Sequence, residues 1–92
     1  MTIIRDPQYL DQLDITLDYI AKDSLENALS LLDRIDYQIS ILDEMPLKFR
    51  KSFHFDDERI RDLIINGYTI PYFADYDNDK IVILDIFKWV DR

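Results

Sequence analysis

Residues 60–72 read IRDLIINGYTIPY, and this stretch decides the fold. Asn66-Gly67 is the strongest short signal for a β-hairpin, because both residues tolerate the positive φ that a two-residue type I′ turn requires. On either side the residues alternate with a period of two, which predicts strands over residues 60–65 and 68–76. Pro71 lies inside the second strand and has no N–H to donate, so we expect a bulge or an unpaired position there.

A third strand is predicted downstream of this hairpin. Residues 80–87 are rich in Ile, Val and Phe, and Asp77-Asn78-Asp79 supplies the turn that precedes them. The three strands together are expected to form an antiparallel meander.

The N-terminal part predicts one short strand and a first helix. Residues 2–5 are β-prone, Asp6 is placed to cap a helix, and Pro7 takes the first helical position, where its missing N–H costs nothing. Apolar residues then recur three or four positions apart, at Leu10, Leu13, Leu17 and Ile20.

A second helix follows almost at once. It opens at Asp23 or Ser24, and Pro46 stops it. The link is so short that the two helices must be antiparallel neighbours. The apolar stripe of this helix is wider than contact with one helix requires, so we expect it to pack on the sheet as well. Its members are Leu25, Ala28, Leu29, Leu32, Ile35, Ile39 and Leu42, with Leu31 and Ile41 on a flank.

The predicted fold class is therefore α+β, with the order β-α-α-β-β-β and the helical hairpin packed on one face of an antiparallel sheet. A chain of 92 residues has room for one core, so residues 1–92 are expected to form a single domain. The helix residues expected in that core are Leu13, Leu17, Leu32, Ile35 and Ile39, packed against Leu63, Ile70 and Ile83 of the strands.

The composition bounds the class of protein. Hydrophobic residues make up 48% and charged residues 33%, as in a globular protein. Cysteine is absent, which excludes disulfides and thiolate zinc sites and fits a reducing compartment. The sequence shows no signal peptide and no apolar run long enough for a membrane span, so a cytoplasmic location without membrane partners is expected.

The charge is negative overall but unevenly distributed. The formal net charge of −8 argues against broad affinity for nucleic acid or anionic lipid. Residues 48–61 are the exception, because five bases stand there against three acids. If the protein contacts phosphate, this segment is the expected place.

No strong enzyme motif is present. A metal site would need the single histidine, His54, together with Asp56, Asp57 or Glu58, and such a run of polar residues is better explained as a solvated loop. Neither a metal nor another cofactor is predicted.

Basic and aromatic residues remain as candidates for metal-independent RNA cleavage, which needs a base, cations at the scissile phosphate and an acid. The candidates that one sheet face could gather are Lys48, Lys51, His54, Arg61, Tyr72 and Lys88. Several of these basic and aromatic residues also have a simpler explanation. Lys48, Arg50 and Lys51 can solubilise a loop, Arg61 can pair with a helix acid, and Tyr68 and Tyr72 can be core residues.

Residues 61–72 resemble the strand–turn–strand signature of the RelE/ParE superfamily of toxins. In that signature an Arg opens the strand, a small-residue turn follows, and two Tyr flank an Ile or Val, as in Arg61, Tyr68, Ile70 and Tyr72. The resemblance extends over nearly the whole chain. The other positions that fit at the family's intervals are Tyr19-Ile20, Ser24, Ala28, Ile35, Leu42, Pro46 and the last strand, 81–87.

This resemblance implies a toxin of a type II toxin–antitoxin module, in which a small cognate antitoxin wraps and neutralises the toxin. The RelE branch cleaves mRNA on the ribosome, and the ParE branch poisons DNA gyrase. By position, Arg61 matches the strand-opening Arg of the family. The chain departs from the pattern at Thr69, where many members have Arg, and at Asp85 and Lys88, where many have Arg and His.

Three hypotheses about action stay open. The first is a metal-independent endoribonuclease acting on the ribosome, with Arg61, Lys51, His54 and Lys88 as catalytic residues. The second is a toxin that inhibits a protein such as DNA gyrase. The third is a superfamily member with little or no toxicity that serves as a partner-binding module.

Overall fold

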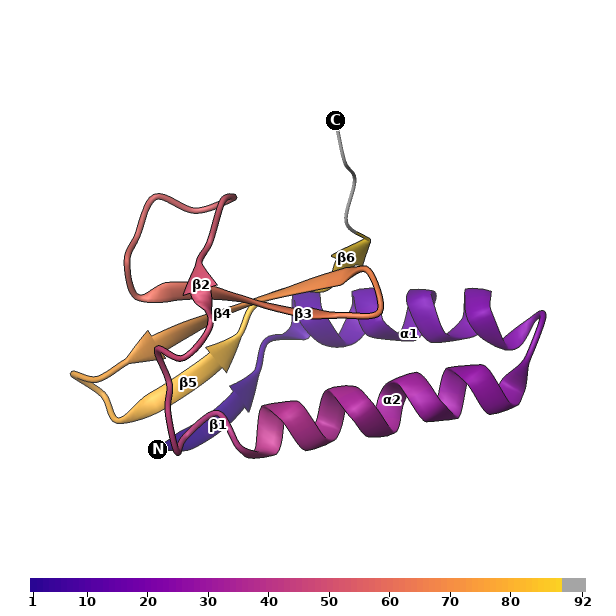
Figure 1. The fold of residues 1–92 in the computed structure, drawn as a ribbon, viewed down its shortest axis with the longest axis horizontal. Helices are drawn as coiled ribbons and strands as arrows, with labels where there is room; N and C mark the ends of the chain where they lie inside the picture. Colours follow the sequence, from indigo (N-terminus) through magenta and orange to yellow (C-terminus); the bar gives the residue numbers. More distant parts are fainter. Residues whose placement is uncertain (89–92) are drawn as a thin grey trace.

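The computed structural model describes residues 1–88 and confirms the predicted order of a strand, two helices and a sheet (Figure 1). The last four positions of the predicted domain lie outside the described residues. The elements are β1 (Thr2–Arg5), α1 (Pro7–Ala21), α2 (Leu25–Ser40), β2 (Arg50–Lys51), β3 (Ile60–Ile65), β4 (Tyr68–Asp75), β5 (Lys80–Ile83) and β6 (Phe87–Lys88).

The strands form one sheet in the order β1-β5-β4-β3-β2, with β6 also paired to β4. The predicted antiparallel meander is its centre, β3-β4-β5. The sequence predicts the strand over residues 2–5 but not its partner in the sheet, and it does not predict β2. β1 pairs with β5 in the parallel direction, and the two-residue β2 pairs antiparallel with the start of β3.

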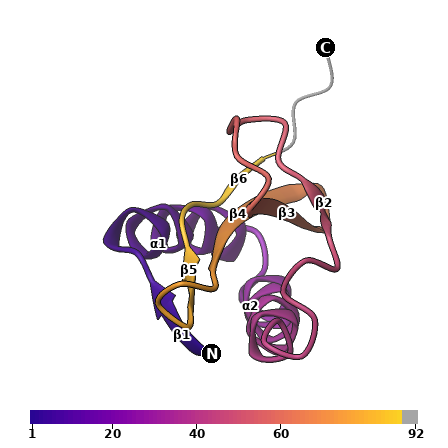
Figure 2. The same cartoon turned by 90° about the vertical axis from the view of Figure 1, so that its left-hand side faces the viewer.

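The helices cover one face of this sheet, and the loop between β2 and β3 lies on the other side (Figure 2). The helical hairpin also extends past the β3–β4 turn, so that its tip, where the two helices are joined, projects beyond the strands (Figure 1). Neither helix in residues 1–88 is long and apolar enough to cross a membrane.

The β3–β4 hairpin turns where the sequence predicted. Asn66 and Gly67 have φ values of 51° and 83°, as a type I′ turn requires, and Ile65 pairs with Tyr68 across it. Nothing lies within 4 Å of the position that a Cβ at Gly67 would occupy, so the positive φ, and not crowding, is what favours glycine there.

The irregularity expected at Pro71 is on one side of β4 only. Pairing with β3 runs unbroken through Pro71, opposite Asp62. On the other side the Pro71 carbonyl accepts from Leu84 N at 2.9 Å, so its nitrogen also faces that side. A ladder hydrogen bond is missing there, and the last strand is interrupted.

The single strand predicted over residues 80–87 is therefore wrong in its extent. β5 ends at Ile83, opposite Tyr72, and β6 resumes with Phe87 opposite Thr69. Three residues, 84–86, thus face two, 70 and 71, which is a bulge in the strand that faces Pro71. The Asp85 carboxylate accepts from the Ile86 N–H at 2.8 Å within this interruption.

The helix ends differ from expectation in detail. Pro7 occupies the start of α1, but Asp6 makes no capping hydrogen bond with its side chain. In α2 the cap is Ser24, whose hydroxyl accepts from Asn27 N at 3.1 Å. That helix ends at Ser40 and not at Pro46, because the next backbone bonds already span three residues, as from Leu42 N to Ile39 O.

The core contains most of the predicted residues. Leu13, Ile35, Ile39, Leu63, Ile70 and Ile83 are buried, and Leu17 and Leu32 are partly buried against them. The apolar face of α2 is rotated from the prediction, since Leu31 is buried whereas Leu25 and Leu29 are 64% and 53% exposed. Both exposed leucines lie in the first half of α2, near the link between the two helices.

Ile35→Ala should lower the free energy of unfolding by about 2–5 kcal/mol, because it leaves a cavity in a core that the wild-type side chain fills completely. The matched control is Leu29→Ala on the same helix, which removes an exposed side chain and should change stability by less than about 0.5 kcal/mol. Urea unfolding of both variants measures the difference. Equal midpoints for the two would contradict the assigned helix face.

Candidate functional site

Residues 48–61, hereafter the basic segment, include β2, the loop over residues 52–59 and the first two residues of β3. The chain enters the segment after α2 and is held to the sheet on the way. The Tyr72 hydroxyl donates to the Pro46 carbonyl at 2.7 Å, and the Tyr72 ring meets the Phe49 ring edge-on with centroids 6.4 Å apart.

Tyr72 is therefore a core residue, as the simpler explanation proposed. Its side chain has no exposed surface, and burial raises its pKa from 10.0 to about 12. A phenol with this pKa keeps its proton near neutral pH. Tyr72 accordingly positions the entry to the basic segment and is not suited to act as a base.

Arg61 braces the two ends of the basic segment. Its Nε donates to the Glu58 carbonyl at 2.9 Å and its Nη1 donates to the Phe49 carbonyl at 3.2 Å. The guanidinium thus binds backbone carbonyls, and not a helix carboxylate as one explanation proposed. This arrangement suits a planar donor group that can serve two acceptors at once.

The other cations of the segment also have partners within it. Lys51 stands opposite Arg61 in the β2–β3 register, and its Nζ lies 3.2 Å from a Glu58 carboxylate oxygen. Arg59 binds the Asp57 carboxylate through two contacts, of 2.9 and 3.1 Å, and this hydrogen bonding lowers the pKa of Asp57 below its ordinary value. Lys51 and Arg59 are therefore both paired with acids of the basic segment itself.

Arg50 joins this network through a buried acid that the sequence analysis did not single out. Its Nη2 lies 3.8 Å from Asp62 Oδ2, and its guanidinium lies 4.1 Å from the centre of the Phe53 ring. Asp62 is only 1% exposed, and the same oxygen accepts from Phe53 N at 3.3 Å. The carboxylate thereby holds the start of the loop against the sheet.

Two buried polar atoms beside this contact have no hydrogen-bond partner among the described residues, namely Asp62 Oδ1 and Thr69 Oγ1. The register places both residues on the sheet face away from the helices, two positions apart along adjacent strands. Alternation along β3 could have placed Asp62 on that face. Its burial could not have been anticipated, because it depends on the loop.

His54 and Lys88 lie at the other end of β4. The His54 ring packs edge-on against Phe87 of β6 with centroids 4.7 Å apart. Lys88 pairs with Tyr68, whereas Arg61 pairs with Tyr72 on the opposite side of β4. Four residue steps along a strand correspond to about 13 Å.

The structure thus brings together two of the four predicted catalytic residues, Lys51 and Arg61. His54 packs against Phe87 and so lies on the face of the sheet to which the Phe87 side chain points. Lys88 is the next residue of β6, so its side chain points to the opposite face. No group of three His, Asp or Glu side chains within residues 1–88 is placed to hold a metal ion.

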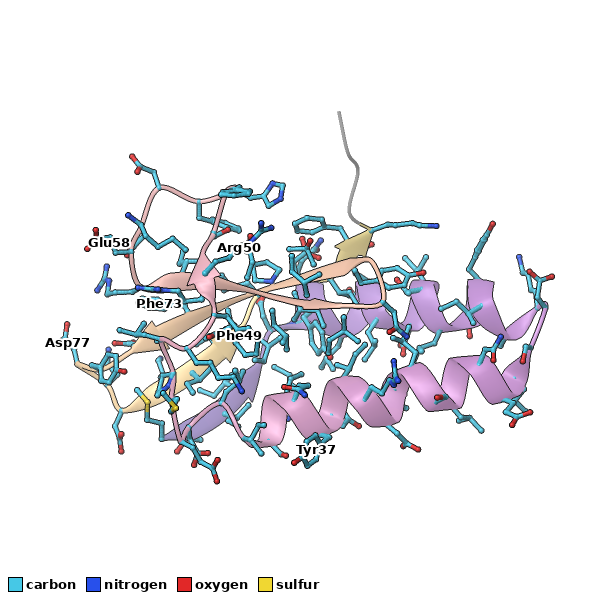
Figure 3. The ribbon with its side chains drawn as sticks, viewed as in Figure 1. Tyr37, Phe49, Arg50, Glu58, Phe73 and Asp77 are labelled. Carbon is cyan, nitrogen blue, oxygen red and sulfur yellow. The ribbon has the colours of Figure 1, made fainter. Side chains whose placement is uncertain are left out.

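A groove of about 550 Å³ runs between α2 and the outer edge of β3. Figure 3 marks two of the residues that line it, Tyr37 on α2 and Phe49 before β2. The full lining consists of Arg34, Tyr37, Gln38, Lys48, Phe49, Leu63, Ile64, Ile65 and Asn66. An open groove with an apolar floor and polar walls is suited to binding a polypeptide.

The comparisons with known proteins agree with this architecture. A family model described as "ParE toxin of type II toxin-antitoxin system, parDE" matches residues 3–88. Among solved structures, a chain of the "Chromosomal ParDE TA system from P. aeruginosa" superposes with a TM-score of 0.75 at 19% identity, covering 98% of this chain and 97% of that chain. A search of curated proteins found no significant match.

A strand, a helical hairpin and a largely antiparallel sheet in this order define a RelE/ParE-like toxin fold. Because the family match spans nearly all described residues, the chain belongs to the ParE toxin family of type II toxin–antitoxin systems. The resemblance inferred from residues 61–72 is confirmed.

Tyr72→Phe should destabilise the protein by about 0.5–1.5 kcal/mol, because it removes the donor to the Pro46 carbonyl. Tyr9→Phe is the matched control, since the Tyr9 side chain is equally buried but its hydroxyl has no partner among the described residues. Losing that hydroxyl should be neutral or stabilising. Urea unfolding of both variants compares them, and a larger loss for Tyr9→Phe would contradict the assigned tether.

Proposed function

We propose that this chain is a toxin that acts by binding and inhibiting a protein target in the cytoplasm, and that a small cognate antitoxin neutralises it. DNA gyrase is the target that the resemblance to the ParE branch implies. The observation that carries the proposal is the engagement of the basic segment's cations by groups of the chain itself, at the place where a nuclease would need them for its substrate.

The argument starts from what RNA cleavage requires. Without a metal, cations must converge on the scissile phosphate, close to an acid and a base. Arg61 instead donates to two backbone carbonyls, and Lys51 lies beside the Glu58 carboxylate. A phosphate would therefore have to compete with the Glu58 carboxylate for Lys51, and Arg61 is held in one orientation with only its remaining N–H groups to offer.

The wider charge distribution supports the same proposal. RNA and ribosomal surfaces are polyanionic, and a chain of net charge −8 is repelled by them at long range. A protein target carries no such general penalty. Exposed aromatic side chains such as Phe53, which is 71% exposed, are the kind of anchor that protein interfaces use.

Ribosome-dependent mRNA cleavage is the second candidate. One observation favours it, namely that Lys51 and Arg61 are neighbours across β2 and β3. In this alternative, binding of RNA would release both cations, and His54 and Lys88 would be brought to them by movement of the loop and of β6.

Transcript mapping and a gyrase assay distinguish the two candidates. Induced expression should arrest growth with a DNA-damage response and without new codon-phased mRNA ends, and the purified chain should inhibit supercoiling by DNA gyrase. Lys51→Ala should leave the inhibition unchanged. Codon-phased cuts that Lys51→Ala reduces by about 10²–10³ in rate would instead establish the nuclease. Normal growth at full expression would favour a non-toxic binding module.

Co-expression tests the antitoxin. The product of a small reading frame next to this gene should relieve the growth arrest and co-purify with the chain as a stable complex, because the exposed apolar side chains of the hairpin and groove offer it a surface. The control is an unrelated antitoxin of similar size. Separate elution of the two proteins at micromolar concentration would contradict this part of the proposal.

A further inference from the structure

We propose that the loop over residues 52–59, hereafter the aromatic loop, is the surface by which the chain binds its protein target, and that the hollow of this loop receives a basic side chain of that target. The inference rests on the proposed function and specifies where and by what chemistry the inhibited protein is held. It follows from three properties of the loop: exposed aromatic rings, an unpaired acid and a backbone fixed by hydrogen bonds.

Two aromatic side chains of the loop are exposed. Phe53 is 71% exposed, the largest fraction among the large apolar side chains of residues 1–88, and Phe55 is 41% exposed. The loop stands on the side of the sheet away from the helices, so the helical hairpin does not cover these rings (Figure 2). Aromatic rings that a partner can bury are the commonest anchors of protein interfaces.

The aromatic loop curls around a hollow of about 670 Å³. The lining of this hollow combines aromatic rings with carboxylates, and consists of Lys51, Ser52, Phe53, His54, Phe55, Asp56, Asp57 and Glu58. Aromatic faces attract cations through their quadrupole, and carboxylates accept charge-assisted hydrogen bonds from them. A Lys or Arg side chain has an apolar stem and a cationic head, so it matches both parts of the lining.

The charge of the loop also favours a basic occupant. The basic segment has an excess of bases as a whole, but the aromatic loop within it holds three acids against one base. Two of these acids are already paired with Lys51 and Arg59. The third, Asp56, is exposed and forms no ion pair with any residue in the described part of the chain. Its carboxylate is therefore available to a cation of the partner.

Hydrogen bonds hold the aromatic loop in place before a partner arrives. The Ser52 N–H donates to the Ile60 carbonyl at 2.9 Å and so joins the two ends of the loop. The Phe53 N–H donates to the buried Asp62 carboxylate at 3.3 Å, and the Arg50 guanidinium lies 4.1 Å from the centre of the Phe53 ring. Binding to a surface that is already ordered loses less conformational entropy.

A basic side chain is also what the proposed target offers. Enzymes that act on DNA carry Lys and Arg where they contact the phosphates. A chain of net charge −8 is attracted to such a surface at long range. A basic residue held in the aromatic loop would no longer be available to DNA, so occupation of the hollow would explain the inhibition of DNA gyrase.

Other occupants match the loop less well. A second copy of the chain also carries −8, and like charges oppose its approach. A phosphate is repelled by the Asp56 carboxylate. A bare metal ion needs several ligands, and the described residues, 1–88, contain no three His, Asp or Glu side chains placed to hold one. The aromatic part of the lining likewise favours an organic cation.

The first test measures inhibition of supercoiling by purified DNA gyrase. Phe53→Ala should raise the half-inhibitory concentration of the chain roughly tenfold or more, because it removes the most exposed ring of the loop. Tyr76→Ala is the matched control, since its ring is 55% exposed but lies outside the lining of the hollow, and it should inhibit like the wild type. Urea unfolding checks that both variants are folded.

The second test identifies the charge of the occupant by its salt dependence. In calorimetric titration of DNA gyrase, the affinity of the wild-type chain should fall as the salt concentration rises, because salt screens the attraction between the two proteins. Asp56→Asn should bind about three- to tenfold more weakly and with a shallower salt dependence. Asp14→Asn, which removes an exposed acid on α1, should bind like the wild type.

The outcomes separate this inference from the proposed function. If the wild-type chain inhibits gyrase and Phe53→Ala inhibits equally well, or loses no more than Tyr76→Ala, the aromatic loop is not the target surface. A loss with Phe53→Ala but unchanged affinity of Asp56→Asn would overturn the basic occupant. A wild-type chain that neither binds nor inhibits gyrase would overturn both proposals. Self-association of the isolated chain that Phe53→Ala abolishes would assign the loop to a second copy.

Discussion

The structure depends on β4, the strand that is paired on both sides and buried against the helices. Ile70, Tyr72 and Ala74 have no exposed surface, and β3, β5 and β6 all pair with this strand. Its helix-facing residues form the floor of the core, and Tyr72 reaches beyond the sheet to hold the chain at Pro46. A substitution in β4 is therefore expected to disturb the packing of the core and the position of the basic segment together.

The parts of the fold that depend on local chemistry could be predicted from the sequence. The Asn66-Gly67 turn fixes the β3–β4 register by itself, and Pro7 and Ser24 mark helix starts in the way their backbone and side-chain chemistry requires. The parts of the fold that depend on packing between elements could not be predicted in this way. Leu29 and Leu31 are equally apolar but lie on different faces of α2, and the rotation of the helix against its neighbours decides which of them is buried.

The candidate site shows the same division. Charge counting located the basic segment, but it could not reveal that Arg61 donates to carbonyls, or that Asp62 is buried beneath the loop. Hydrogen bonds to backbone atoms leave no trace in composition or spacing. By residue type, Lys51, His54, Arg61 and Lys88 are equally good catalytic candidates. The strand register shows that Lys51 and Arg61 are neighbours, whereas Lys88 lies at the other end of β4.

The projecting tip of the helical hairpin has an evolutionary consequence. Leu25 and Leu29 lie in the first half of α2, next to the link between the two helices, and their side chains are exposed and contribute little to the core. Substitutions at such positions leave no cavity, so the chain can vary this surface at little thermodynamic cost. Related chains with the same sheet can therefore diverge at the tip and come to recognise different partners. In this way duplicated modules within one cell could become insulated from one another while their shared scaffold remains the same.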